Sequence, residues 1–424
     1  MKIKTKKLSF EQVRALPKPI HKKPKKRGFL FSALIRVLSF FDMLGTGFSY
    51  TTHHMEKAGD GPYLILMNHS SFIDLEIASV VRYPAPHCIV STFDGLVGKE
   101  WLMRQIGCIP TQKFVSDFRL LSDIRYALKE LKTDVLMFPE AGYSFDGCAT
   151  TLPRHLGLLL KRLDVPVLHI QTYGAFARDP LYNGLQKRKV KVSATLSCLL
   201  SRDELREKSV EEIDAVIDRA FSFDSFAWQA ENGIEIQEPF RADGLHRILY
   251  RCPHCESEGA MEGKGTKLTC HACGKVYELD TLGRLQAEEG ETAFPHIPDW
   301  YAWEREQVRK EIEDGSYRLD AEVDIGVLAD HKALYMVGSG RLIHDREGFR
   351  LTGCGGTLSY TQPPRASHSL NSDYFWYEIG DVIGIGDSQM LYYCFPKGGE
   401  PVAKARLAAE ELYKMEKSEK APAR

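Results

Sequence analysis

Short apolar runs alternate with amphipathic segments over the first half of the chain. Four runs are typical of buried strands, and they lie at residues 64–67, 88–91, 135–138 and 165–171. Residues 117–131 place apolar side chains at helical spacing, and 190–196 alternate as expected for a further strand. Ser201 followed by Glu204 predicts a capped helix start. This order of elements predicts an α/β sheet with flanking helices that ends near residue 240.

The pattern changes in the last third of the chain. Short strands separated by turn residues are predicted at 333–337, 348–352, 357–360, 375–379 and 390–395. Residues 299–313 predict a charged helix, and 401–417 carry apolar positions at helical spacing. Strands closed by one helix predict a β-rich, barrel-like domain that looks like a pleckstrin-homology or GRAM-type barrel. Such barrels often bind lipid headgroups or peptides, and a scaffold without a ligand is the alternative.

The first 50 residues differ from both regions. Residues 1–27 hold eleven lysines and arginines against one acid, Glu11, and their prolines argue against a continuous helix, so we expect a flexible cationic arm. Residues 29–44 are strongly apolar but short, and Arg36 and Asp42 interrupt them, so they predict an interfacial helix rather than a membrane span.

An arm and helix of this kind favour a cytoplasmic protein that binds membrane lipid on the inner face of the membrane. The alternative is a helix buried in a soluble core, with the arm solvated or in contact with nucleic acid. No small-residue cleavage site follows the apolar stretch convincingly, which argues against a secretory signal.

Composition is compatible with several domains. The 424 residues are 43% hydrophobic with a net charge of −1, enough to bury a sizeable core. The patterns divide the chain into an arm and interfacial helix, an α/β domain, a small cysteine-rich domain and a β-rich domain with its closing helix, at residues 1–50, 51–240, 241–288 and 289–424.

Two closely spaced cysteine pairs carry the clearest metal signal. Cys252 and Cys255 form one CxxC pair, Cys270 and Cys273 form a second, and fourteen residues lie between the two pairs. Four thiolates from two such knuckles bind zinc tetrahedrally, so the spacing predicts a zinc ribbon holding structural zinc. Paired disulfides or a redox dithiol are the alternatives. The nearby histidines, His254 and His271, are expected to be bystanders.

The remaining cysteines show no paired spacing and are typical of free thiols in a reducing cytosol. They are Cys88, Cys108, Cys148, Cys198, Cys354 and Cys394. Basic residues in the ribbon are balanced by acidic ones, which disfavours nucleic acid as its partner. A structural staple or a protein-interaction module is expected instead, with its partner unknown.

Candidate catalytic chemistry lies directly after the first buried run. His69 can take the proton of an attacking alcohol, and Asp74 can hold the other ring nitrogen and stabilise the imidazolium. Five residues along a helix separate two side chains by roughly 140°, so the pair predicts a loop that runs into a helix start. Ser70 and Ser71 are suitable caps for that helix.

Four blocks, in this order and spacing, make residues 45 to 215 similar to one family. They read NHSSFID, GCIPTQK, FPEAGYS and VPVLHI. The chain resembles the glycerolipid acyltransferases, in particular the lysophosphatidic acid acyltransferase group. The resemblance implies that His69 is the general base, that Asp74 orients it, and that the acyl group passes directly from acyl-CoA or acyl-carrier protein to a lysophospholipid hydroxyl.

The resemblance also implies an acceptor site. Its residues would be Asn68, Gly107, Lys113, Glu140, Gly142 and Tyr143. The third block departs from the family, which reads glycine, threonine and arginine where this chain has Ala141, Gly142 and Tyr143. Without the guanidinium, the case for a lysophosphatidate acceptor is weaker than the case for acyl transfer. The alternative for Lys113 and Tyr143 is a solvated lysine and a packed aromatic ring.

Two readings from other classes remain open. In the first, the acyltransferase fold is a platform for a non-catalytic lipid-binding adaptor. In the second, the protein is a zinc-ribbon nucleic-acid binder, which would need a basic face that the ribbon lacks.

Overall fold

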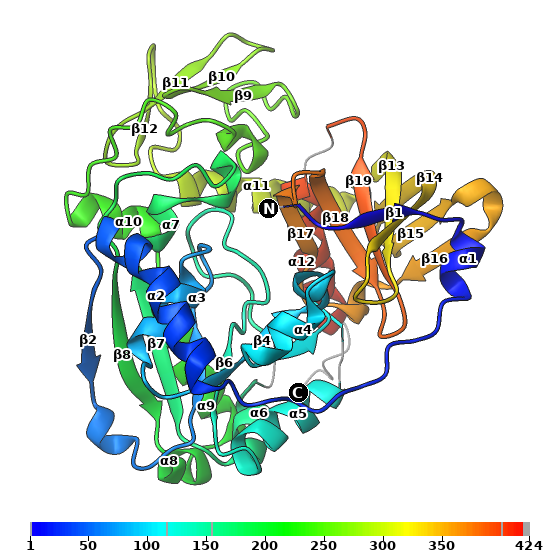
Figure 1. The fold of residues 1–424 in the computed structure, drawn as a ribbon. Coiled ribbons are helices and arrows are strands. Elements are labelled where there is room, and N and C mark those ends of the chain that lie inside the picture. Colours follow the sequence, from blue (N-terminus) through cyan, green and yellow to red (C-terminus); the bar gives the residue numbers. More distant parts are fainter. Residues whose placement is uncertain (1, 116–117, 154–155, 400–401, 419–424) are drawn as a thin grey trace.

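The computed structural model describes residues 2–115, 118–153, 156–399 and 402–418. An α/β part and a β-rich C-terminal part lie on opposite sides of the molecule, and a small four-stranded sheet lies beside both (Figure 1). The mixed α/β architecture with a β-rich C-terminal region is therefore confirmed.

The α/β part is built on a seven-stranded sheet in the order β2-β8-β7-β3-β6-β4-β5. Neighbouring strands are parallel except for β7 and β8. The strands are β2 (Ser49–His53), β3 (Leu64–Met67), β4 (His87–Thr92), β5 (Cys108–Thr111), β6 (Asp134–Met137), β7 (Val167–Tyr173) and β8 (Ser193–Leu200). Strand β3 lies between parallel neighbours, and a strand covered on both faces is expected to be apolar throughout.

Successive residues of β3 pack on opposite faces of this sheet. Leu64 and Leu66 join a buried cluster with the helices on one face, and Ile65 and Met67 join a second cluster on the other. The first face carries α5 (Phe118–Lys129), α6 (Leu156–Leu163), α8 (Arg202–Glu207) and α9 (Val210–Phe221), and the second carries α2 (Phe29–Gly45) and α3 (Asp74–Val81). Shorter helices are α4 (Glu100–Gln105), α7 (Ala175–Arg178) and α10 (Ser225–Glu231).

Local signals predicted most of these elements closely. Ser201 and Glu204 form the expected capping box. Residue 117, the expected start of the helix at 117–131, lies outside the described residues. The strand expected at 190–196 is β8, which begins three residues later, at Ser193. Val190 and Val192 precede the strand and are buried in two different clusters.

The four-stranded antiparallel sheet has the order β12-β11-β10-β9 and contains both cysteine pairs at or near its strands. Its strands are β9 (Met261–Lys264), β10 (Lys267–Cys270), β11 (Val276–Leu279) and β12 (Leu285–Ala287). One continuous cluster of buried side chains runs from this sheet through α11 (Ile297–Asp314) into the C-terminal part. Trp300 of α11 is fully buried in that cluster, so the two parts share a core.

The C-terminal part is a sheet in the order β16-β15-β14-β13-β19-β18-β17. Its strands are β13 (Leu319–Leu328), β14 (Leu334–Asp345), β15 (Gly348–Gly353), β16 (Leu358–Gln362), β17 (Asn371–Trp376), β18 (Gly380–Gly386) and β19 (Leu391–Pro396). Among the described residues no backbone pairing joins β16 to β17, so closure of a barrel stays a prediction.

One predicted strand of this sheet is misplaced. Of the residues 375–379, Phe375 and Trp376 end β17, and 377–379 form the turn to β18. Tyr377 and Glu378 in that turn adopt positive φ angles of 48° and 64°. The apolar and aromatic character of this segment, which favoured a strand, belongs to a tight hairpin tip.

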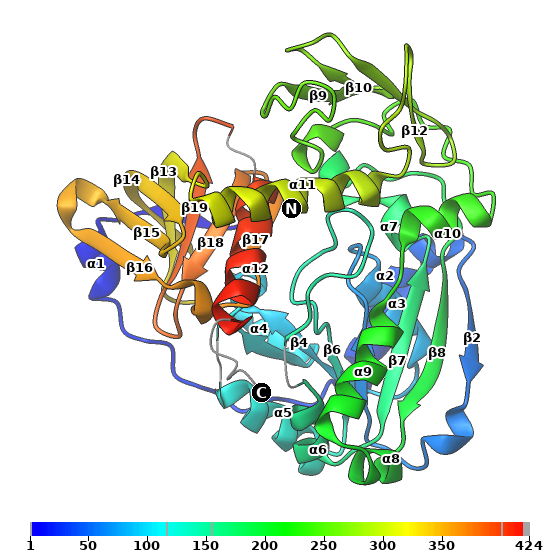
Figure 2. The ribbon, with the colours of Figure 1, turned by 180° about the vertical axis from the view of Figure 1, so that it is seen from behind.

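The expected closing helix is α12 (Val402–Ser418), which packs across α11 (Figure 2). Residue 401, where the sequence placed its start, lies outside the described residues. Leu407 and Ala408 are fully buried, so α12 is a core element that lies between the α/β part and the C-terminal sheet.

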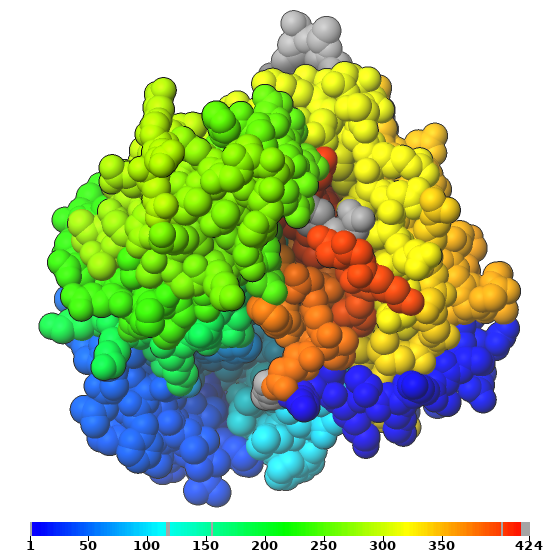
Figure 3. All heavy atoms as spheres, turned by 90° about the horizontal axis from the view of Figure 1, so that it is seen from above, coloured from blue at the N-terminus to red at the C-terminus, as the bar shows by residue number. Residues whose placement is uncertain are grey.

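The N-terminal arm, whose charge predicted a flexible segment, contacts both large parts of the chain. Strand β1 (Thr5–Lys7) pairs in parallel with β14, and α1 (Phe10–Arg14) buries Phe10 and Val13 against the C-terminal core. Figure 3 shows these first residues in blue against the C-terminal strands. Residues 15–28 then cross to the α/β part, so the arm is a strap between two distant parts of the chain.

The strap is fixed to the α/β part by specific contacts. His21 lies 2.9 Å from an Asp123 carboxylate oxygen. Arg27 is buried and donates to the carbonyl of His87 at 3.2 Å. Helix α2 begins directly after it. No helix in the described ranges is both long and apolar enough to cross a bilayer.

Candidate active site

His69 and Asp74 meet as their spacing predicted, in the loop between β3 and α3. His69 lies two residues beyond the end of β3, and Asp74 is the first residue of α3. The imidazole Nδ1 lies 3.0 Å from Asp74 Oδ2. The Asp74 side chain is fully buried, while that of His69 is 17% exposed. The pair therefore lies at the carboxyl edge of the central parallel strands, where open α/β sheets bind their ligands.

The loop is folded around the Asp74 carboxylate. Oδ2 accepts the backbone N–H groups of Ser70 at 2.8 Å and Ser71 at 3.0 Å, as well as the imidazole. Oδ1 is buried without a hydrogen bond to any described residue. The two serines do not cap α3, whose N-cap is Ile73; they contribute main-chain donors, and the Ser71 hydroxyl donates to Asp179.

Two aromatic rings enclose the His69 imidazole. The Phe138 ring lies 4.2 Å from it at an angle of 29°, and the Tyr143 ring lies 4.1 Å away at 34°. Because Asp74 accepts from Nδ1, the proton is held there and the lone pair is left on Nε2. In the described part of the chain, Nε2 has no hydrogen-bond partner. The arrangement leaves one nitrogen ready to accept a proton.

Glu140 ties the next segment to this loop. One of its oxygens accepts the His69 backbone N–H at 2.8 Å, and the other accepts the Thr150 N–H at 3.0 Å and hydroxyl at 3.2 Å. Burial raises the pKa of Glu140 to about 7. Both oxygens are therefore engaged by the protein itself, and these contacts give Glu140 a structural role beside the loop. Its contact with an acceptor stays a prediction.

The segment after Glu140 is under backbone strain. Ala141 has φ of 55°, in the left-handed region that glycine adopts freely and alanine rarely does. This is the position where the resembled family has glycine. Such a conformation persists only when surrounding contacts hold it.

Two residues predicted to bind the acceptor have structural roles. The Asn68 carboxamide bonds Thr172 on β7 through both its ends, with Nδ2 donating to the hydroxyl and Oδ1 accepting the backbone N–H, each at 2.9 Å. Gly107 has φ of 88°, and a Cβ there would lie 3.0 Å from the His87 carbonyl. Both observations explain the residue types without a ligand.

Strand register also places Gly107 away from the dyad, and its place in the acceptor site stays a prediction. The Gly107 carbonyl accepts the backbone N–H of Ile89. Gly107 lies level with Cys88 of β4, which through β6 is level with Leu64 at the start of β3. His69 is five residues further along, roughly 16 Å of extended chain. Sequence spacing alone gives no information about which end of a strand a residue occupies relative to another strand.

Lys113, Gly142 and Tyr143 lie at the carboxyl edge of the α/β sheet, as the dyad does. Lys113 follows the carboxyl end of β5, and the ring of the next residue, Phe114, lies 3.9 Å from where a Cβ on Gly142 would be. Burial raises the pKa of Asp373 on β17 to about 6, and the Lys113 ammonium lowers it in opposition. The lysine therefore has a carboxylate of the C-terminal part in its vicinity.

An exposed apolar surface adjoins this edge, and we call it the apolar patch. Eight large side chains of α2 are 48% to 77% exposed: Phe29, Leu30, Leu34, Val37, Leu38, Phe40, Phe41 and Leu44. Exposed Phe72 and Leu75 of the α3 region and Trp101 and Leu102 of α4 extend it, with the Trp101 ring 6.5 Å from Phe31. The helix is thus not buried in the core. Phe72 lies 5.6 Å from Tyr143, which joins the apolar patch to the ring stacked on His69.

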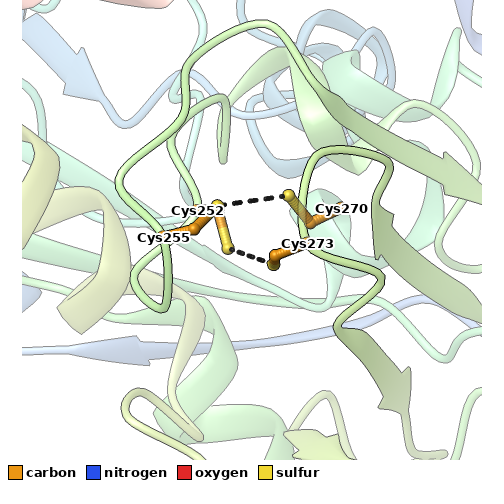
Figure 4. Close-up of side chains that lie close together, drawn as sticks. All are labelled: Cys252, Cys255, Cys270 and Cys273. Atoms are coloured by element: carbon orange, nitrogen blue, oxygen red, sulfur yellow. Dashed lines mark hydrogen bonds between the residues drawn. The ribbon is translucent and has the colours of Figure 1, made fainter.

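The four predicted metal ligands converge at the edge of the small sheet (Figure 4). Their Sγ atoms all lie within 4.8 Å of one another, with Cys252 to Cys273 at 3.8 Å and Cys255 to Cys270 at 3.7 Å. A tetrahedral ion bound at 2.3 Å separates its sulfurs by roughly 3.8 Å, so the donor set fits zinc. In both knuckles, a residue after the CxxC pair adopts positive φ and donates back to the carbonyl of its first cysteine.

Several residues at the site carry no local sequence signal. Thr150 binds Glu140, and Arg406 donates to the carbonyl of Tyr143 from a helix 263 residues later. Asp179 accepts the Ser71 hydroxyl, and burial raises its pKa to about 6. Only the tertiary fold brings these groups to the dyad.

Comparison with known proteins finds a similarity to one family. Residues 49–170 match the family model described as Acyltransferase, a range that contains the dyad and Glu140. The crystal structure of the 1-acyl-sn-glycerophosphate (LPA) acyltransferase PlsC from Thermotoga maritima is similar at 18% identity, covering 45% of this chain and 78% of that chain with a TM-score of 0.32. No curated protein matches the chain. The part of the chain that holds the dyad is therefore similar to the Acyltransferase family.

Proposed function

We propose that the protein is a membrane-peripheral O-acyltransferase. It moves a fatty acyl group from acyl-CoA or acyl-carrier protein to the hydroxyl of a lysophospholipid-like acceptor. The observation that carries the proposal is the His69–Asp74 pair, whose free Nε2 lies beside rings that continue into the apolar patch. The match to the acyltransferase family supports the reaction class.

The proposed reaction needs one base and no acyl-enzyme. Nε2 of His69 accepts the proton of the acceptor hydroxyl while its oxygen attacks the thioester carbonyl carbon. The tetrahedral adduct then collapses: the carbon–sulfur bond breaks, the new ester carbon–oxygen bond remains, and the thiolate takes the proton back from the imidazolium. Asp74 stabilises that imidazolium from Nδ1.

The surroundings of the imidazole suit this step. Phe138 and Tyr143 cover its two faces and keep water from the ring, and charge interactions are stronger where water is excluded. The Ser70 and Ser71 backbone donors keep the Asp74 carboxylate in place without the need for a counter-cation. The base is thus preorganised before the substrates bind.

The apolar patch supports a site on the surface of a membrane. Burying a large apolar side chain contributes about 1.5 to 3 kcal/mol, and eight from α2 are available. Exposed lysines of the strap precede α2, and each basic residue near an anionic leaflet contributes about 1 kcal/mol. We place the protein on the cytoplasmic face of the membrane, where both substrates could reach the dyad.

Lys113, Gly142 and Tyr143 are the proposed acceptor contacts. An ammonium can bind a phosphate as a point charge, although the guanidinium of the resembled family is missing from the third block. The nearby Asp373 carboxylate adds repulsion toward a phosphate dianion. A phosphodiester-linked headgroup, which carries a single negative charge on its phosphate, suits this pair better than a phosphate monoester.

We propose that Cys252, Cys255, Cys270 and Cys273 hold one structural zinc ion. Four protein thiolates leave no open position for chemistry, so the ion would stabilise the small sheet rather than act on a substrate. Cys252 and Cys270 belong to the buried core that continues through α11 toward α12, while Cys255 and Cys273 are exposed, so the ion would join the edge of the small sheet to that core.

The test is acceptor-dependent release of free thiol from acyl-CoA and from acyl-carrier protein. A panel of lysophospholipids in mixed micelles, with monoester and diester headgroups, identifies the acceptor. His69→Ala should lower the rate at least about a hundredfold. The matched control is His53→Ala, which removes an exposed histidine from edge strand β2 and should leave the rate unchanged.

Two outcomes would contradict the proposal. A rate that survives His69→Ala would exclude the dyad as the catalytic base. Binding of these lipids by the folded, zinc-loaded protein without thiol release from either donor would make the non-catalytic adaptor the better account.

A further inference from the structure

Helix α12 contacts the segment that stacks on the catalytic histidine. Arg406 is 4% exposed, and its Nη1 donates to the carbonyl of Tyr143 at 3.1 Å. The guanidinium also lies 4.3 Å from the centre of the Phe145 ring, so it holds the chain on both sides of Ser144. Ser144 in turn donates its N–H to the carbonyl of His69 at 3.1 Å.

Glu410, one turn further along α12, holds the other end of the same segment. Its Oε2 accepts the Thr151 hydroxyl at 3.4 Å, and Oε1 accepts the Ser369 hydroxyl at 2.6 Å. Arg305 Nη1 of α11 lies 2.8 Å from Glu410 Oε2, and Arg406 Nε donates to Glu410 Oε1 at 3.3 Å. Burial alone raises the pKa of Glu410, but the two guanidinium groups outweigh it and lower the pKa to about 2. The carboxylate therefore stays charged.

One layer of residues separates this pair from the dyad. Tyr143, bound through its carbonyl by Arg406, stacks its ring on His69. Thr150, next to the residue bound by Glu410, donates to Glu140, which accepts the backbone N–H of His69. Both routes end on the catalytic residue itself.

The segment needs such support. Ala141 is held at a positive φ that is unfavourable for an alanine, so the conformation depends on outside contacts. A buried ion pair is seldom more stable than apolar residues of the same volume, because both charges lose their hydration. The Arg406–Glu410 pair is thus better explained by the geometry that it imposes than by stability.

We propose that Arg406 and Glu410 are positioning residues of the acyltransferase site, through which the C-terminal part holds Tyr143 and Glu140 in place on His69. The inference rests on the proposed function for its kinetic consequence. It means that the acyltransferase domain is not a complete catalyst by itself: its active-site segment takes its shape from a helix more than 250 residues later.

Kinetics provide the first test. Arg406→Gln removes the charge and the reach to Tyr143, and we expect kcat to fall about 10-fold to 100-fold with the KM for the acyl donor unchanged. Arg406→Lys keeps the charge beside Glu410 but not the fork that bridges two partners, and should retain an intermediate kcat. This second variant keeps the test usable if the first does not fold.

The matched control is Lys404→Gln on the same helix. Lys404 bonds Glu258 at 2.7 Å and Glu311 at 2.8 Å and has no contact with the active-site segment among the described residues. It should lower the thermal stability as Arg406→Gln does and leave kcat unchanged. An equal loss of kcat in both variants would overturn the proposal, because it would reflect general destabilisation.

A second readout does not depend on catalysis. Diethyl pyrocarbonate transfers an ethoxycarbonyl group to accessible imidazole nitrogens, releasing ethanol and carbon dioxide. Mass spectrometry gives the rate at each histidine, with exposed His271 as internal reference. Arg406→Gln should let Tyr143 move and speed modification of His69 about tenfold relative to His271, and Lys404→Gln should not. An unchanged His69 rate would refute the positioning role. If the parent has no transferase activity, a faster His69 rate would still support positioning while the proposed function fails.

Discussion

Asp74→Asn separates the charge of the dyad from its geometry. Asp74 Oδ2 accepts three donors, from His69 Nδ1, Ser70 N and Ser71 N. An asparagine can place its carbonyl oxygen where Oδ2 lies, and the two serine amides oppose the reversed orientation because it would set N–H against N–H. The substitution should therefore preserve the Nδ1–H tautomer and remove only the negative charge.

The loss of rate follows from the 3.0 Å separation. Two unit charges at that distance attract by about 5 kcal/mol at an effective dielectric constant of 20. The dipole of an asparagine carbonyl retains part of this, which leaves about 4 kcal/mol less stabilisation of the imidazolium in the transition state. We expect kcat to fall about 1000-fold.

The loss of stability should be much smaller. The new amide nitrogen takes the place of Oδ1, which is buried without a described partner. An unsatisfied buried donor costs about 1 to 3 kcal/mol, so the variant should fold with a lowered Tm. Thiol release at saturating acceptor gives kcat, and circular dichroism gives Tm and confirms the fold. A folded variant that retains more than about a tenth of kcat would refute the role of the Asp74 charge.

Three further predictions concern other parts of the molecule. Burial raises the pKa of Glu140 to about 7, so folding takes up a proton at this carboxyl group. The protonated Glu140 stabilises the fold by about 3 kcal/mol below the usual carboxyl pKa, and this stabilisation is lost as pH rises through about 7. Glu140→Gln should flatten the profile of Tm against pH over that range, and an unchanged profile would contradict the raised pKa. Elemental analysis should find about one zinc per chain, lost in Cys255→Ser and retained in Cys354→Ser, and equal zinc in both variants would exclude the cysteine site. Phe41→Glu in the apolar patch should weaken co-sedimentation with anionic vesicles at least about tenfold, whereas Leu158→Glu on α6 should not, and equal binding would exclude the patch as the membrane contact.

Short-range patterns predicted the parts of the site that depend on neighbours in sequence. The five-residue spacing of His69 and Asp74 requires a loop between strand and helix, and the buried run before it defines the strand. The paired spacing of the cysteines likewise fixes two knuckles that need only a hairpin to meet.

Long-range contacts explain what the sequence could not predict. Gly107 is a glycine because of the His87 carbonyl, and Asn68 is engaged by Thr172, which are contacts made by the tertiary fold. The charge of the arm suggested a solvated tail, because periodicity holds no information about which distant edge a three-residue strand will join. In the sequence Arg406 is one of several charged residues on an amphipathic helix, and only the structure shows that it is buried.

The pairing of β1 with β14 has a consequence for biosynthesis. A ribosome makes the strand at Thr5–Lys7 first, but its partner at Leu334 to Met336 emerges roughly 330 residues later, after about 15 to 65 s of translation. During that interval β1 has no partner strand, while α2 and its exposed apolar side chains are already synthesised. The nascent chain thus exposes the apolar patch well before β14 is available to pair with β1.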